Sequence, residues 1–160
     1  MTHTELCKLT AERFVKTMAL YEVTMLGMER PDVLNFDSSG FAELYEIKMS
    51  RSDFLADRTK EARINPSFGI RRYFVCMGDF IKPEELIGVW DGWGLYHFDG
   101  KFHKKKESKR FDADSAMFRS EAMVLVNHII CEKHNVVFAK RVIDNRIAIK
   151  EKKSINGLHS

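Results

Sequence analysis

Residues 41–57 read FAELYEIKMSRSDFLAD, and this stretch decides the fold. Its first nine residues form an apolar run that predicts a β-strand. Successive side chains of a strand alternate between faces, so Glu46 and Lys48 share one face while Tyr45 and Ile47 share the other. A carboxylate and an amine side by side are costly to bury without partners. The pair suits a site that holds a divalent cation beside a positive group, which indicates metal-dependent phosphodiester chemistry.

The turn before this strand predicts a carboxylate partner for Glu46. A second strand is expected over residues 33–36, followed by the turn sequence DSSG at 37–40. A three-residue loop that ends on glycine, which fits the left-handed region best, places Asp32 opposite Glu46 on the same face. A two-residue loop would shift the register by one and place Asp32 opposite Tyr45. The favoured turn therefore brings two carboxylates together.

A helix is predicted directly after the strand. Ser50 and Asp53 fit an N-terminal capping box, and the helix should continue to about Ile64, before the Asn-Pro pair at 65–66. Its positive N-terminal end would begin within two residues of Lys48, where anions are favoured.

The whole chain is predicted to be one α/β domain, a central mixed sheet flanked by helices in the order helix, three strands, helix, strand, with a C-terminal helical addition. We divide residues 1–160 into a core at about 5–100, a basic loop and helix at 101–150, and a polar tail at 151–160. The other expected elements are a helix over 4–20, strands over 21–25, 71–77 and 136–139, a hairpin over 88–98 around Asp91-Gly92, and a helix over 115–134.

Composition limits the class of protein. The chain has 160 residues with 44% apolar content, which is enough for one buried core. No apolar stretch reaches the roughly 18–20 residues of a membrane span, and the polar start does not resemble a signal peptide. Three widely spaced cysteines predict reduced thiols in a cytoplasmic protein.

These motifs carry a family resemblance. Pro31-Asp32 followed by Glu46-x-Lys48 resembles the signature of the PD-(D/E)XK nuclease superfamily. The continuation over residues 46–57, EIKMSRSDFLAD, resembles the MmcB-like DNA-repair branch of that superfamily. The likeness covers roughly residues 21–94 and implies a restriction-endonuclease-like core.

The resemblance implies a set of site residues. Asp32 and Glu46 would ligate Mg²⁺ or Mn²⁺, and the main-chain carbonyl of Ile47 would complete the set. Lys48 would orient or help to deprotonate the attacking water and stabilise the developing negative charge. The alternative is that Asp32, Glu46 and Lys48 form only a structural ion-pair cluster.

The resemblance also implies an upstream acid near the metal. Glu22, on the strand expected before Asp32, is our choice for this acid. Glu12, on the first helix, is the alternative.

Several residues are candidates for contact with a nucleic-acid backbone. Residues 101–110 carry six Lys or Arg against one Glu, and nearby aromatic side chains could stack on bases or fill the core. Arg51 and Arg58 lie seven residues apart on one helix face, and could contact phosphates or pair with acids of their own helix. The candidates are Ser50, Arg51, Arg58, Lys104, Lys105 and Lys106.

The leading hypothesis is a Mg²⁺-dependent DNA endonuclease of repair or recombination, with DNA as partner and a homodimer as a possible assembly. The first alternative is a non-catalytic nucleic-acid-binding protein on the same fold, and the second is an interaction or inhibitor domain. The pattern His128-x₂-Cys131-x₂-His134 invites a zinc interpretation, but no fourth ligand follows at helical spacing.

Overall fold

The computed structural model describes residues 1–23, 30–60, 68–112, 121–122, 124–125 and 135–140. Two α-helices, three short 3₁₀ helices and seven strands lie within these ranges. They are α1 (His3–Phe14), β1 (Met18–Tyr21), β2 (Val33–Phe36), β3 (Ala42–Lys48), α2 (Arg51–Ala56), η1 (Asp57–Thr59), β4 (Arg71–Met77), η2 (Pro83–Glu85), η3 (Gly88–Trp90), β5 (Gly94–Phe98), β6 (Phe102–Lys106) and β7 (Val136–Phe138).

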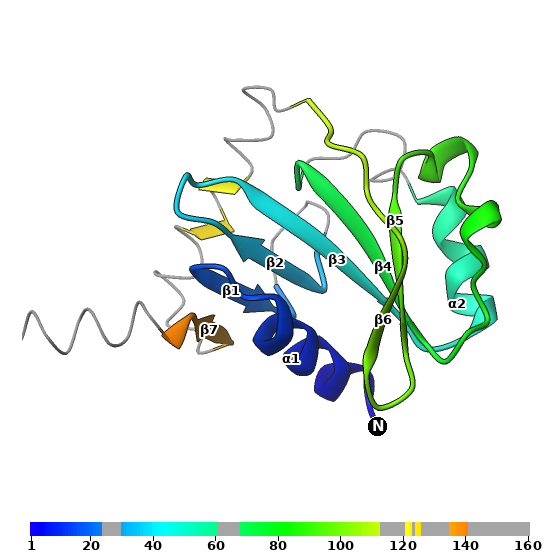
Figure 1. The fold of residues 1–160 in the computed structure, drawn as a ribbon, viewed down its shortest axis with the longest axis horizontal. Helices are drawn as coiled ribbons and strands as arrows, with labels where there is room; N and C mark the ends of the chain where they lie inside the picture. The colour runs from blue at the N-terminus through cyan, green and yellow to red at the C-terminus, as the bar shows by residue number, and fades with distance from the viewer. Residues whose placement is uncertain (24–29, 61–67, 113–120, 123, 126–134, 141–160) are drawn as a thin grey trace, which may run out of the picture.

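The strands form one mixed sheet in the order β6-β5-β4-β3-β2-β1-β7 (Figure 1). The central pairs β3–β4 and β4–β5 are parallel, whereas the pairs toward both edges are antiparallel. The chain is thus an α/β protein with a seven-stranded mixed sheet flanked by helices, as the sequence predicted.

The two α-helices cover opposite faces of the sheet. Leu6 of α1 packs in a cluster with Ile47 of β3, whereas Phe54 of α2 packs in a second cluster with Leu44 of the same strand. Residues 44 and 47 point to opposite faces because side chains alternate along a strand. The C-terminal end of β3 therefore lies between the two helices.

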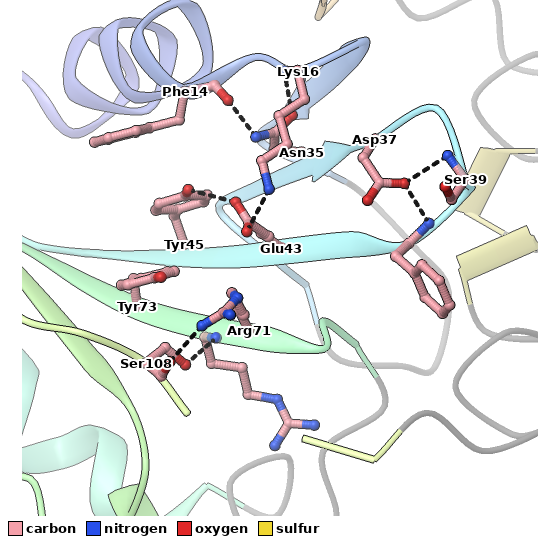
Figure 2. Close-up of polar contacts among 12 residues, drawn as sticks. Phe14, Lys16, Asn35, Asp37, Ser39, Glu43, Tyr45, Arg71, Tyr73 and Ser108 are labelled. Atoms are coloured by element: carbon pink, nitrogen blue, oxygen red, sulfur yellow. Dashed lines mark hydrogen bonds and ion pairs between the residues drawn. The ribbon is translucent and has the colours of Figure 1, made fainter. Parts of the chain in front are cut away.

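The predicted register between β2 and β3 is confirmed. Val33 pairs with Tyr45, so the next residues outward, Asp32 and Glu46, are opposite each other. Gly40 has φ +82°, the left-handed conformation that a three-residue loop requires at this position. The Asp37 carboxylate accepts a hydrogen bond from the backbone N–H of Ser39, as Figure 2 shows.

Polar contacts at the edge of the core fix the C-terminal end of α1 on the sheet (Figure 2). The Asn35 side chain of β2 donates to the carbonyl of Phe14 and accepts from the N–H of Lys16 at 2.9 Å. The Lys16 ammonium also lies 2.6 Å from the Glu43 carboxylate, which accepts from the Tyr45 hydroxyl at 3.0 Å. These bonds orient α1, and with it the side chains of its first turns.

Two predicted boundaries near the N-terminus were wrong. The first helix ends at Phe14 and not near residue 20, and β1 occupies 18–21 in place of the expected strand over 21–25. Pairing on both sides, with β2 and β7, makes Met18–Tyr21 a strand despite its helix-like apolar spacing. Tertiary pairing outweighs local pattern here. The helix predicted to reach residue 64 is seen as α2 and η1, and residues 61–67 lie outside the described ranges.

The expected hairpin over 88–98 was also wrong. Its first half is the helix η3, in which Trp90 is fully buried, and Gly92 forms a turn that leads into β5. The hairpin is instead formed by β5 and β6, with Phe98 opposite Phe102. The segment predicted as a basic loop is therefore an edge strand, and lysines are common on such edges because they oppose further pairing.

The strands predicted over 71–77 and 136–139 are confirmed as β4 and β7. The helix predicted over 115–134 and the His128, Cys131 and His134 pattern fall almost wholly outside the described residues. Within the described ranges, neither α-helix has the length and apolar character needed to cross a bilayer.

Candidate metal centre

Three carboxylates occupy one row across neighbouring strands. Tyr21 pairs with Val33 and Val33 with Tyr45, so the next position outward holds Glu22, Asp32 and Glu46. The backbone continues the ladder at this row, because the N–H of Glu22 donates to the carbonyl of Asp32 at 2.7 Å. The row lies at the C-terminal end of β3, where the sequence predicted the site.

The Asp32 side chain is held against β3 and α1. One carboxylate oxygen, Oδ2, accepts from the backbone N–H of Ile47 at 2.8 Å. The other, Oδ1, lies 3.4 Å from Nε2 of His3. Asp32 therefore reaches the strand that carries Glu46, and the two contacts fix its orientation.

Glu46 and Lys48 are buried on the same face of β3, as the alternation predicted. The Lys48 ammonium lies 3.8 Å from the Glu46 carboxylate and 2.9 Å from Oδ1 of Asp57, with Asp53 at 3.9 Å. Asp57 is itself fully buried and also contacts Lys60 at 2.9 Å. Lys48 is thus a buried cation surrounded by three carboxylates.

Asp57 was not predicted as a partner of Lys48. It was only one of the acids of the predicted helix with which Arg51 or Arg58 could pair instead of contacting phosphates. The short helix α2 instead turns Asp57 inward beneath β3. The sequence did contain one sign of this contact, namely a carboxylate about two turns into the helix that follows the Glu-x-Lys strand.

Of the two candidates for the expected upstream acid, Glu22 lies in the row and Glu12 does not. The backbone of Glu22 has φ +49°. Every other described residue with a positive φ is a glycine. The carboxylate of Glu22 accepts a hydrogen bond from Thr4 of α1, beside the row. Glu12 pairs with Lys8 on an exposed part of α1. A non-glycine residue in the left-handed region stores strain of about 1–3 kcal/mol, and such strain clusters at functional sites.

His3 and Cys7 were not predicted as site residues. They are four residues apart on α1, and Sγ of Cys7 lies 3.5 Å from Nδ1 of His3, whose Nε2 approaches Asp32. The order Cys7, His3, Asp32 resembles a nucleophilic triad. However, Cys7 is fully buried, and burial, followed by the charges of Asp32, Glu22 and Glu46, raises the pKa of its thiol far above the ordinary value. It is not an activated nucleophile.

Known proteins offer only a structural likeness. No family profile and no curated protein matches the chain. A solved structure is similar in fold: a protein of unknown function from Silicibacter pomeroyi, with a TM-score of 0.54 and 20% sequence identity over 72% of this chain and 77% of that chain. That likeness shows the fold alone.

The surrounding carboxylates change the pKa of His3. Its side-chain hydrogen bond with Asp32 raises the pKa of His3 above the ordinary 6.5, although partial burial opposes the shift; the charges of Asp32, Glu22 and Asp53 add to the increase. A raised folded-state pKa means that the interaction stabilises the protein fully below pH 6.5. The stabilisation is lost as pH rises through the folded-state pKa of His3.

Asp32→Asn is expected to lower the pKa of His3 toward its ordinary value, because the hydrogen bond from a charged imidazole to a carboxylate is lost. Histidine ring NMR signals, followed against pH in the presence of a chelator, measure this shift. Asp99→Asn is the matched control, since Asp99 lies 2.9 Å from a different histidine, His103. An unchanged His3 pKa in Asp32→Asn would contradict the arrangement.

The row and Ile47 offer only oxygen donors. Mg²⁺ and Mn²⁺ prefer oxygen ligands, and one or two carboxylates are typical. Asp32 and Glu46 offer carboxylate oxygens from adjacent strands, and Ile47 offers a main-chain carbonyl between Glu46 and Lys48. The contacts of Asp32 with Ile47 and His3 occupy one lone pair of each oxygen, which leaves a second on each for a cation.

The residues predicted to contact DNA through α2 have protein partners. Ser50 caps the helix, with its hydroxyl accepting from the N–H of Asp53 at 3.2 Å. Arg51 forms a two-pronged ion pair with Glu85 and donates to the carbonyl of Phe80 at 3.0 Å. The Arg58 guanidinium lies 4.8 Å from the centroid of the Trp90 ring. Of the acids of the predicted helix, Asp53 and Asp57 contact Lys48, and Glu61 lies outside the described residues.

The three lysines of β6 differ in their surroundings. Lys104 pairs with Glu107 at 2.7 Å, and the Lys106 ammonium donates to the carbonyls of Pro83 and Leu86. Lys105 is exposed and lines a cavity of about 360 Å³. The remaining residues around this cavity are Gly78, Asp79, His97, Asp99 and His103.

Proposed function

We propose that the chain is a Mg²⁺-dependent nuclease that hydrolyses DNA phosphodiester bonds in repair or recombination. The observation that carries this proposal is the row of Glu22, Asp32 and Glu46 across three adjacent strands, with Lys48 buried beside Glu46. The element order α1-β1-β2-β3-α2-β4 further supports a restriction-endonuclease-like core of the PD-(D/E)XK superfamily, and the run over residues 46–57 supports its MmcB-like branch.

The chain's residues divide the work of such a site. Asp32, Glu46 and the Ile47 carbonyl would hold the ion, and Glu22 would add a third carboxylate at the end of the row. When bound, Mg²⁺ supplies Lewis-acid polarisation of the phosphate and lowers the pKa of a coordinated water. Lys48 places a fixed positive charge where negative charge develops in the reaction.

Asp57 prepares Lys48 for this role. A charge that is already oriented stabilises a transition state without reorganising at the moment of reaction. The 2.9 Å contact with the fully buried Asp57 fixes the ammonium, and only 2% of the Lys48 side chain is exposed. The lysine is therefore held in one place in a region of low water content.

The same contact favours the second candidate function, a non-catalytic nucleic-acid-binding protein. In that case Lys48, Glu46 and Asp57 would form a structural cluster that supports the fold, and DNA would bind without being cut. Buried charges of this kind also occur as structural elements alone.

A cleavage assay separates the two functions. The protein is incubated with single-stranded, duplex and branched DNA and Mg²⁺ or Mn²⁺, with a chelator as blank, beside Asp32→Ala and Lys48→Ala. The exposed residues Asp91 and Lys82 provide matched control variants, Asp91→Ala and Lys82→Ala. The nuclease proposal expects Asp32→Ala and Lys48→Ala to lose cleavage, and Asp91→Ala and Lys82→Ala to retain it. Binding without cleavage on every substrate would support the second function, and cleavage that survives both substitutions would refute the site.

Lys105 is the β6 lysine best placed to contact a DNA phosphate. We expect Lys105→Ala to weaken DNA binding and to reduce the slope of log affinity against log salt by about one, since each phosphate contact releases about one counterion. Lys8→Ala, an exposed change on α1, is the control. Fluorescence anisotropy at several salt concentrations measures both slopes. Identical slopes for Lys105→Ala and the unmodified protein would exclude this contact.

A further inference from the structure

A second set of potential metal ligands adjoins the carboxylate row. His3 and Cys7 lie four residues apart on one face of α1, and both approach Asp32 at the start of β2. One nitrogen of His3, Sγ of Cys7 and one carboxylate oxygen of Asp32 lie within 4.8 Å of one another. This cluster contains sulfur and nitrogen, unlike the oxygen donors expected to hold Mg²⁺.

The spacing suits a tetrahedral ion. Zinc bonds of about 2.0 Å to nitrogen or oxygen and about 2.3 Å to sulfur place neighbouring ligand atoms about 3.3–3.6 Å apart. Nε2 of His3 lies 3.4 Å from Oδ1 of Asp32 and 4.0 Å from Sγ of Cys7. Sγ of Cys7 and the carboxylate of Asp32 lie within 4.8 Å of each other, so a contraction of the cluster would bring all three atoms within bonding distance of one ion.

Charge and access also fit a divalent ion. The thiolate of Cys7 and the carboxylate of Asp32 together balance a charge of +2, and neutral His3 completes three protein ligands. The His3 side chain is 40% exposed and that of Asp32 is 21% exposed, so an ion can enter from solvent, whereas Cys7 supplies a buried sulfur. Binding forms a metal–sulfur bond and releases the thiol proton to solvent.

We propose that His3, Cys7 and Asp32 form a binding site for a thiophilic divalent metal ion such as Zn²⁺, with the fourth position open. Asp32 is shared with the carboxylate row. An ion bound to the sulfur site therefore competes for this carboxylate, and Zn²⁺ inhibits Mg²⁺-dependent cleavage. The inhibition rests on the proposed nuclease function, whereas the binding does not.

Cobalt spectroscopy tests the binding. The chelator-treated full chain is titrated with Co²⁺, whose thiolate complexes show a sulfur-to-cobalt absorption band in the near ultraviolet. We expect one equivalent of Co²⁺ to produce the band, Cys7→Ser to abolish it, and Cys76→Ser, a buried cysteine on the opposite sheet face, to retain it. Because Cys7→Ser alters the core, His3→Ala provides a second test. We expect His3→Ala to reduce the affinity for Co²⁺ at least about 10-fold. No band in the unmodified protein, or a band that persists in folded Cys7→Ser, would overturn the proposal.

Zinc inhibition is measured separately on any DNA substrate that is cut with Mg²⁺. Rates are normalised to each protein's own rate without Zn²⁺, and we expect His3→Ala to require at least about 10-fold more Zn²⁺ for half-inhibition. Equal sensitivity of the two proteins would refute competition at this site. Absence of any cleavage would count against the nuclease proposal, while the cobalt titration would still decide the metal site.

Discussion

Glu46→Gln is expected to lower Mg²⁺-dependent DNA cleavage by at least about 100-fold while the protein remains folded. The amide has the same shape as the carboxylate but no negative charge, so the ion loses one of its two main ligands. Removal of a single preorganised group from an active site commonly reduces the rate by about 10²–10³-fold. Cleavage under single-turnover conditions, at several Mg²⁺ concentrations, measures the loss.

Glu43→Gln is the matched control for this change. Glu43 is also a buried glutamate of β3, but it points to the opposite face and contacts Lys16 and Tyr45. Cleavage by folded Glu43→Gln should remain within a few-fold of the unmodified protein. Equal losses in the two variants would show that Glu46 acts through stability and not through the reaction.

Asp57→Asn is expected to reduce the free energy of unfolding by about 3 kcal/mol. Breaking a buried ion pair from one side costs about 3–5 kcal/mol, because the remaining charge is left without compensation. The lower end applies here, since Glu46 and Asp53 approach the same Lys48 ammonium at 3.8 and 3.9 Å. Urea unfolding, followed by circular dichroism, measures the change.

The control for Asp57→Asn is an exposed ion pair with nearly the same distance between its charged atoms. Asp91 lies 2.8 Å from the Lys109 ammonium, and its side chain is 69% exposed. Asp91→Asn should change the free energy of unfolding by less than about 1 kcal/mol, because solvent screens such pairs. If both substitutions had the same small effect, Lys48 would not depend on Asp57 for its buried position.

The pairing of Asp32 with Glu46 could be predicted because it depends on local rules. The glycine at the end of the turn over 38–40 fixes the register of β2 and β3, and alternation along a strand then fixes the face. Asp32 and Glu46 follow from these two rules alone. The same reasoning failed at Gly92, where a genuine glycine turn connects η3 to β5 and not two strands.

The partners of the charged side chains could not be predicted, because they depend on how distant segments pack. Arg51 pairs with Glu85, which is 34 residues away, and Asp57 turns inward to Lys48. His3 and Cys7 join the site because α1 crosses the sheet above the start of β2. Their spacing of four residues was visible in the sequence, but nothing local indicated that Asp32 would complete the group.

The central claim is that Asp32 and Glu46 hold one divalent ion beside Lys48, and Mn²⁺ tests it most directly. Paramagnetic Mn²⁺ broadens the NMR signals of nearby backbone amides. Substoichiometric Mn²⁺ should therefore broaden the amide signals of Glu22 and Ile47 first. The amide signal of Ser39, at the far end of the same hairpin, should stay sharp. The effect should persist in Cys7→Ser and vanish in Glu46→Gln. Uniform broadening, or broadening near Ile47 that survives Glu46→Gln, would contradict the account.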